Sequence, residues 1–463
     1  MTASKTIITA MPNGRRGIDM GPIKILLIAF LVAVGRIALV AQTGSVDPSR
    51  KPELSLQIKA TLGGHAKEII DIVFNADGES FATASQDGLV QLWNSRTLEK
   101  QAAFSRSGKY SNLVWAPGGR TIAITRKGRD DNYETEICDT RTSKSGVVIP
   151  AGKNFPHSVW SPDGQMILIV DMGRTVKVWN ASTGKLISSL EQDPPCPKRS
   201  FLESPSKPAC SDFNFVSGRF LSDARTVLTS SPASSSKLWD AESGKLKATL
   251  DDRESRKFIA MADPDGRVLV VDKAGTVTLL DSTTGSVKLT LEDAGVPQEF
   301  SPDSRSLLMV KSLSTDRNGA QIRLLDVSSG DVRTTFEIQV VPWNVTAHWS
   351  PDGRFVVVAG NGQTQTIVVD MRTGQVVVKL PYSGCSPDTW IGSTGCEPFL
   401  FSADGLIAMK QARPLRLFST DGGSLAKVEN ASLPADFSPT NASMFVTRGQ
   451  DKRVAVVWEI VWK

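Results

Sequence analysis

The sequence predicts an all-β fold in which a unit of strands and tight turns recurs nine times. Two observations support this prediction: compact turns rich in Ser, Pro, Asp and Gly return every 36 to 61 residues, and a bulky apolar residue follows each of them. Pro, Asp and Gly are the residues that tight turns between strands require. The turns begin at Asn75, Ala116, Ser161, Ser222, Asp263, Ser301, Ser350, Ser402 and Ser438.

The bulky apolar position stands 16 to 24 residues after the start of each turn. It is occupied by Trp93, Cys138, Trp179, Trp239, Leu280, Leu325, Val369, Phe418 and Trp458. In several units a second turn ending in Gly follows, as in "NASTG" (180–184) and "DVSSG" (326–330). Glycine suits the left-handed backbone position that opens the next strand, so this pattern indicates repeated hairpins.

The first unit, "GGHAKEIIDIVFNADGESFATASQDGLVQLWN" (63–94), combines a Gly-His pair, an Asp in an inner turn and a Trp. Four short antiparallel strands in each spacing, together with these residues, resemble a blade of the WD-repeat β-propeller family, and the resemblance covers residues 53–463. It implies a single closed β-propeller of four-stranded blades, nine by the count of units, with eight regular blades and a degenerate one as the alternative. It also implies a buried hydrogen-bond network of His65, Thr83 or Ser85, Asp87 and Trp93. The other units depart from the family pattern, because none keeps the Gly-His pair and several replace Trp.

The last residues, "RVAVVWEIVWK" (453–463), alternate as a strand whose outer edge needs a partner. An exposed strand edge invites aggregation, so folded proteins cover it. The segment "LSLQIKATL" (54–62) precedes the first unit and parallels "KLKATL" (245–250), which is expected to be an outer strand. We therefore predict that residues 54–62 pair with residues 453–458 and close the ring.

Residues 1–41 are expected to form a signal peptide or an N-terminal membrane anchor, and residues 42–52 a linker to the ring. The apolar run from Ile25 to Gly35 has 11 residues and lies between Lys24 and Arg36. A membrane span needs about 20 apolar residues, so an export signal fits better, with an uncleaved anchor of residues 22–41 as the alternative. The expected location is therefore periplasmic or extracellular, with membrane contact only through this segment.

Antiparallel alternation places the loops between blades and the loops between second and third strands on one face. The long insertions, 191–215, 381–398, 126–133 and 312–319, all fall there. Tyr, Trp and Arg are frequent anchors of protein interfaces, and several lie in these segments. The predicted partner-binding residues are Tyr110, Arg126, Arg129, Tyr133, Trp343, Tyr382 and Trp390. As an alternative, Trp343 and Trp390 serve only to pack their own loops.

The five cysteines follow the same division. Cys196 with Cys210, and Cys385 with Cys396, are local pairs inside the two largest insertions, whereas Cys138 takes a core position. We expect two loop disulfides and one buried thiol, since an exported chain can be oxidised and a bridge stabilises a loop without its own core. Unpaired thiols in the insertions are the alternative.

No catalytic or metal-binding signature is present. His65, His157 and His348 are scattered over three units, and the sequence lacks a Gly-x-Ser-x-Gly elbow, a phosphate loop and a Cys-x-x-Cys pair. Of the net charge of +5, residues 1–41 contribute +4, which leaves no basic footprint for nucleic acid. We predict a non-catalytic scaffold, without cofactor or metal, that binds other proteins. The alternatives are a module for envelope carbohydrate and a propeller hydrolase or lactonase.

Overall fold

The regular elements of the described structure are all β-strands. This computed structural model describes residues 54–105, 109–128, 130–142, 145–153, 156–171, 175–191, 217–231, 234–250, 260–266, 268–273, 276–312, 319–338, 346–359, 366–380, 399–405, 407–410, 415–420, 425–428 and 430–462. The chain divides into two units, Met1–Arg50 and Lys51–Lys463, and every strand belongs to the second. The predicted signal or anchor (1–41) and linker (42–52) lie outside the described residues.

The described strands form nine antiparallel sheets of four strands, numbered here as blades 1 to 9. Blade 1 contains β2 (Ile69–Phe74), β3 (Ser80–Ser85), β4 (Leu89–Asn94) and β5 (Lys100–Ser105). Blade 2 contains β6 (Lys109–Trp115), β7 (Thr121–Lys127), β8 (Tyr133–Asp139) and β9 (Ser145–Gly152). Blade 3 contains β10 (His157–Trp160), β11 (Met166–Val170), β12 (Val176–Asn180) and β13 (Leu186–Leu190). Blade 4 contains β14 (Ser217–Phe220), β15 (Thr226–Ser231), β16 (Ser234–Asp240) and β17 (Leu246–Thr249).

The remaining five blades repeat this order of strands. Blade 5 contains β18 (Ala260–Ala262), β19 (Val268–Lys273), β20 (Thr276–Asp281) and β21 (Val287–Leu291). Blade 6 contains β22 (Val296–Phe300), β23 (Ser306–Ser312), β24 (Ala320–Asp326) and β25 (Val332–Ile338). Blade 7 contains β26 (Thr346–Trp349), β27 (Phe355–Ala359), β28 (Thr366–Asp370) and β29 (Gln375–Leu380). Blade 8 contains β30 (Phe399–Phe401), β31 (Ile407–Lys410), β32 (Arg416–Ser419) and β33 (Leu425–Lys427), and blade 9 contains β34 (Ala431–Phe437), β35 (Met444–Gly449), β36 (Ala455–Trp462) and β1 (Leu54–Leu62).

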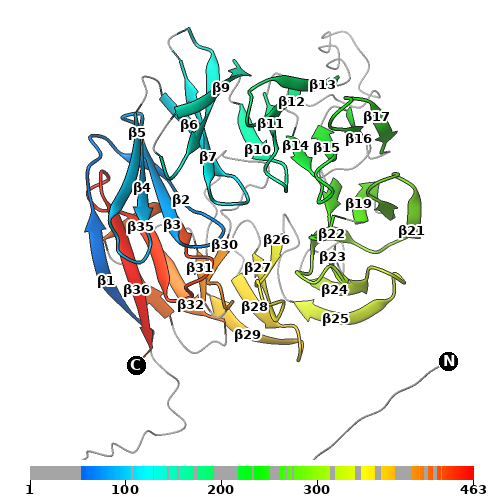
Figure 1. Ribbon diagram of the computed structural model, residues 1–463. Coiled ribbons are helices and arrows are strands. Elements are labelled where there is room, and N and C mark those ends of the chain that lie inside the picture. The colour runs from blue at the N-terminus through cyan, green and yellow to red at the C-terminus, as the bar shows by residue number, and fades with distance from the viewer. Residues whose placement is uncertain are drawn as a thin grey trace, which may run out of the picture. The chain divides into compact units, whose positions relative to one another are not determined.

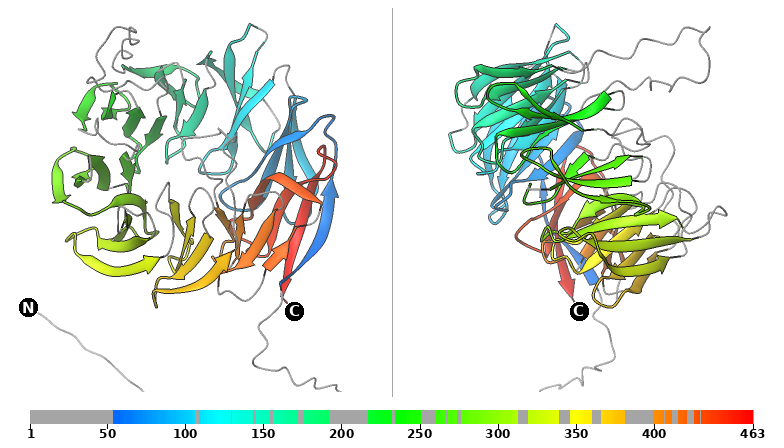
Figure 2. Two further views of the ribbon diagram at one scale, coloured as in Figure 1. Left: turned by 180° about the vertical axis from the view of Figure 1, so that it is seen from behind. Right: turned by 90° about the vertical axis from the view of Figure 1, so that its right-hand side faces the viewer.

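The sheets follow one another around a ring, so the fold is a β-propeller (Figure 1; Figure 2 shows it from behind and from the side). The prediction of nine repeating units is confirmed by the nine sheets. Each predicted bulky position lies in the third strand of its blade, from Trp93 in β4 to Trp458 in β36, and all nine side chains are buried.

The two ends of the ring meet in blade 9. Strand β1 pairs antiparallel with β36, from Leu54 opposite Trp462 to Leu62 opposite Ala455. The pairing of residues 54–62 with the C-terminal strand is therefore confirmed, but the part of that strand predicted to pair, 453–458, was too short, because the pairing runs from Ala455 to Trp462. Because β1 is nine residues long and pairs along its length, its partner extends to Trp462.

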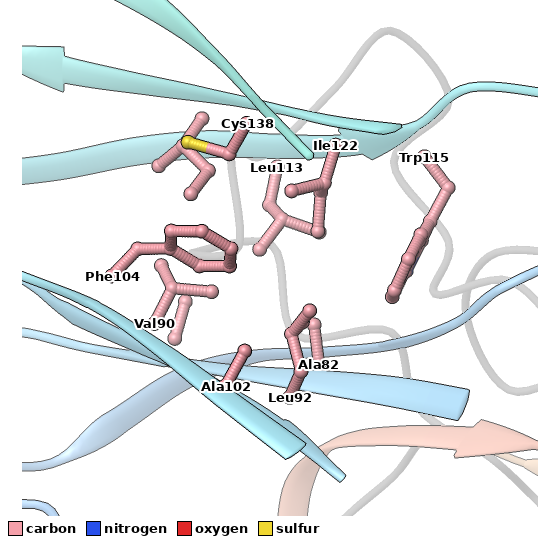
Figure 3. Close-up of a cluster of buried hydrophobic side chains, with 11 residues drawn as sticks. Ala82, Val90, Leu92, Ala102, Phe104, Leu113, Trp115, Ile122 and Cys138 are labelled. Carbon is pink, nitrogen blue, oxygen red and sulfur yellow. The ribbon is translucent and has the colours of Figure 1, made fainter. Parts of the chain in front are cut away.

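Neighbouring blades enclose clusters of buried apolar side chains, and each of the nine interfaces around the ring has one. Between blades 1 and 2, Val90 and Phe104 lie toward Leu113 and Cys138 (Figure 3). Cys138 is fully buried in this cluster, at the core position predicted for it. Blade 9 packs on blade 1 in the same way, so apolar burial supports the ring at its closing interface as elsewhere.

The compact turns of one blade are tied to each other by backbone hydrogen bonds. Ala181 N donates to Gln165 O over 2.9 Å in blade 3, and Met371 N donates to Arg354 O over 2.8 Å in blade 7. The turn that opens the fourth strand also touches the preceding blade: a Cβ added to Gly330, whose φ is 78°, would lie 2.4 Å from Leu289 Cδ2. This left-handed, closely packed position explains the glycine that ends the repeated second turn.

Candidate functional site

The two faces of the ring differ in the loops they carry. The compact-turn face holds the turns between first and second strands and between third and fourth strands, which the hydrogen bonds above hold together. The long-loop face holds the loops between blades and between second and third strands. Its longer described segments are residues 63–68, 86–88, 130–132, 292–295 and 450–454. Loops on a rigid scaffold are the usual carriers of binding, so the long-loop face is the candidate site.

The predicted network of blade 1 lies just beneath the long-loop face. His65 Nε2 lies 2.9 Å from Thr83 Oγ1, and Trp93 Nε1 donates to the same oxygen over 3.0 Å. On the other side of the imidazole, His65 Nδ1 lies 3.6 Å from Asp87 Oδ2. Asp87 also accepts backbone bonds from Ala66 N and Leu89 N. The four side chains therefore connect the loop before β2 to the second and third strands.

Two pKa shifts follow from this arrangement. Burial lowers the pKa of His65 below its usual value, although Asp87 opposes the effect. For Asp87, burial pushes the pKa upward, but the hydrogen bonds from Leu89 N and Ala66 N, with His65 nearby, bring it below its usual value. The hydrogen bond between His65 and Thr83 ties the loop before β2 to the second strand, which suits His65 to a structural role.

The contact between Thr and Trp recurs in two further blades. Trp239 Nε1 donates to Thr229 Oγ1 over 2.8 Å, and Trp458 Nε1 donates to Thr447 Oγ1 over 2.9 Å. At the equivalent position of blade 3 stands Ile169, and among the described residues the buried Trp179 Nε1 finds no hydrogen-bond partner. The sequence contains this second-strand Thr in blades 4 and 9 as well as in blade 1, but the prediction named it for blade 1 alone.

We expect Thr229→Val to lower the free energy of unfolding by about 1–3 kcal/mol, because the indole N–H of Trp239 would remain buried without its acceptor. Chemical denaturation measures the change. In a Trp239→Phe background the same substitution should cost clearly less, since the donor is already gone. Equal costs in both backgrounds would show that the hydrogen bond contributes nothing.

Two predicted partner-binding residues are buried in the ring. Arg126 and Tyr133 are each 4% exposed, so neither can act as a surface anchor, and that part of the prediction was wrong. Strand β7 continues to Lys127 and β8 begins at Tyr133, so both residues belong to strands that pack between blades rather than to a loop. Arg126 Nη1 instead donates to Glu136 Oε2 over 2.8 Å, and its Nη2 donates to Phe104 O of blade 1 over 3.3 Å.

The other predicted site residues are not tested by the structure. For Tyr110 it describes the backbone, in β6. Arg129, Trp343, Tyr382 and Trp390 lie outside the described residues, as do the two predicted disulfide pairs, Cys196 with Cys210 and Cys385 with Cys396. Of the three histidines, His157 lies in β10 and His348 in β26, far along the chain from His65. Burial lowers the pKa of His157.

The part of the chain that the structure describes shows neither a metal cluster nor a membrane-spanning helix. There, no three or more His, Cys, Asp or Glu side chains come together in a way that could hold a metal ion. None of the described elements is a helix long and apolar enough to cross a membrane.

Comparison with known proteins agrees with the architecture. The family model described as "WD domain, G-beta repeat" matches residues 56–94 and 153–180, which belong to blades 1 and 3 and the strand β1. Residues 56–94 and 153–180 thus match the WD40 repeat. The matched segments include the His65 network, whereas the units in which Leu or Val replaces Trp lie outside them.

Similarity to the curated relatives is local. The chain is 26% identical to WD repeat-containing protein 1 of Mus musculus over 98 residues, which are 21% of this chain and 16% of that protein. It is 31% identical over 86 residues to the guanine nucleotide-binding protein G(I)/G(S)/G(T) subunit beta-1 of Homarus americanus, covering 18% and 25% of the two chains. It is 30% identical over 70 residues to the target of rapamycin complex subunit wat1 of Schizosaccharomyces pombe, covering 15% and 22%. These matches span a quarter or less of each relative.

Among solved structures, the β-propeller domain of Myceliophteria thermophila Cps50 (Swd1) is similar to this chain, with 13% identity and a TM-score of 0.46. The alignment covers 88% of this chain and 100% of that domain.

Proposed function

We propose that this WD40 propeller is a non-catalytic scaffold, exported from the cytoplasm, that binds other proteins through its long-loop face. The observation that carries the proposal is the difference between the two faces. Nine rigid sheets hold one face of short, mutually bonded turns and an opposite face whose loops vary in length. Such a framework presents loops in fixed positions, which is how scaffold proteins arrange binding surfaces.

Two further observations support the proposal. WD40 propellers are typically interaction scaffolds, and two of the relatives above are named as subunits of larger complexes. For export, the support is the apolar run at residues 25–35 between basic residues, and the cysteine pairs of the insertions fit an oxidising compartment. Under this proposal the expected partner contacts are Tyr110, Arg129, Trp343, Tyr382 and Trp390.

The test uses the full chain with an affinity tag, recovered from the envelope fraction of its own host. One variant replaces residues 383–397 by a Gly-Ser linker. A second changes three exposed residues of the long-loop face, Lys67, Lys452 and Arg453, to alanine. The matched control changes three exposed residues of the compact-turn face, Lys185, Arg225 and Lys245, to alanine.

We expect the amount of co-purified partner to fall about tenfold in at least one long-loop variant, because the loss of a hot spot worth about 1.4 kcal/mol weakens affinity tenfold. The melting temperature of that variant should stay within about 2 °C of the parent. The compact-turn control should retain the partner. Loss in the control alone would place binding on the opposite face. Recovery of the chain only in the cytoplasmic fraction would contradict export.

A further inference from the structure

A carboxylate lies at the interface where blade 9 meets blade 1. Asp436 is in β34, the first strand of blade 9, and its Oδ2 accepts a hydrogen bond of 2.9 Å from Phe74 N in β2, the first strand of blade 1. Its side chain is partly buried. The bond therefore joins the first and last blades of the chain side by side, at the interface that must form for the ring to close.

The surroundings of Asp436 favour its neutral form. Burial raises the pKa of Asp436 from its ordinary value of 3.8 to about 6, against the hydrogen bonds from Phe74 N and Phe437 N, and the charge of Asp71 in β2 raises it further. On β35 the charged residue is Arg448, which is bound to Glu68 and to Ile69 O of blade 1. Strand β30, which also contacts β34, has the sequence Phe-Leu-Phe and carries no charge.

An equivalent contact at another interface provides a comparison. Glu299 in β22 also stands two residues before the Ser that opens the first turn of its blade, and its Oε2 accepts a bond of 2.9 Å from Trp349 N in the next blade. Its neighbour, however, is His348, whose Nδ1 lies 3.6 Å from the same oxygen. The same hydrogen bond thus occurs beside a basic group between blades 6 and 7, and beside a second carboxylate between blades 9 and 1.

We propose that Asp436 is an acid-strengthened latch, whose protonation tightens the interface that closes the ring. The folded protein holds the proton on Asp436 more tightly than the unfolded chain does. The stability that this proton contributes is therefore fully present below about pH 4, falls as the pH rises through about 6, and is absent above. At neutral pH the ionised carboxylate keeps the hydrogen bond to Phe74 N but faces Asp71 from a partly buried site.

The test compares the full parent chain with Asp436→Asn and with the matched control Glu299→Gln, from pH 4 to pH 8. Asparagine keeps an oxygen acceptor for Phe74 N and removes the charge. We expect Asp436→Asn to lower the unfolding equilibrium constant at pH 7.5 by about 10- to 100-fold, since each unit of pKa difference is worth tenfold and the site is partly exposed. At pH 4 the unfolding equilibrium constants of Asp436→Asn and the parent should be the same. Glu299→Gln should not lower this constant at pH 7.5.

Hydrogen exchange locates the effect. After correction for the intrinsic pH dependence, amides of β1 and β36 should open more readily in the parent at pH 7.5 than in Asp436→Asn, while amides of blade 3 should not differ. If Asp436→Asn fails to fold, Asp71→Asn replaces it and should weaken the same pH dependence. An unchanged pH profile in these variants, or an equal gain in Glu299→Gln, would overturn the proposal.

Discussion

Deletion of residues 53–62 should open the ring and remove most of its stability. Strand β1 forms eight paired positions with β36, and it buries Leu54 and Leu62 at the edges of two apolar clusters. Backbone hydrogen bonds contribute about 0.5–1.5 kcal/mol each, so the loss is on the order of 5 kcal/mol or more, comparable to the whole stability of an ordinary domain. The uncovered edge of β36 should also promote aggregation.

Thermal melting and light scattering measure this result. The matched control deletes residues 42–51, which precede β1, and should melt like the parent chain. A chain without residues 53–62 that remains monomeric and melts cooperatively at the parent temperature would show that β1 is not required for closure.

Substitution of Arg126 by alanine should lower the free energy of unfolding by about 3–5 kcal/mol, the usual cost of removing one partner of a buried ion pair. The side chains of Arg126 and Glu136 are each 5% exposed, so Glu136 would remain as a buried charge without this cation. The pair also joins two blades, because Arg126 bonds Phe104 O.

A double variant, Arg126→Met with Glu136→Leu, is the control. It removes both charges at similar volume and should recover most of the lost stability in a urea unfolding experiment, since apolar replacements of buried ion pairs are often neutral. If Arg126→Ala instead unfolds like the parent but loses partner binding, the residue acts at the surface, as the sequence first indicated.

The repeat, the blade count and the closing strand could be predicted because each depends on local patterns. Turn residues recur wherever the backbone must reverse, and a strand edge without a partner points to a covering strand elsewhere. Arg126 and Tyr133 were misplaced because "RKGRDDNY" is polar, and polarity suggested a loop. Alternation along β7 was the better guide: Arg126 shares a face with Ile122 and Ile124, and Glu136 shares one with Cys138.

The contacts between blades were beyond the sequence for a different reason. Asp436 and Phe74 are 362 residues apart, and their meeting depends on how two sheets stack at the end of the ring. No local pattern distinguishes Asp436 from the many Asp residues that bond to their own turns. The Glu299 contact shows that the position recurs, but only the stacked arrangement reveals it.

The composite blade also has a consequence for the synthesis of the protein. Ser55 in β1 bonds Val461 in β36, 406 residues later, so the strand of the ring that is synthesised first pairs with the strand of the ring that is synthesised last. Until translation reaches Ala455, β1 has no strand to pair with, and it must be kept from pairing with other exposed strand edges. A chain truncated before Ala455 lacks β36 and therefore cannot close the ring.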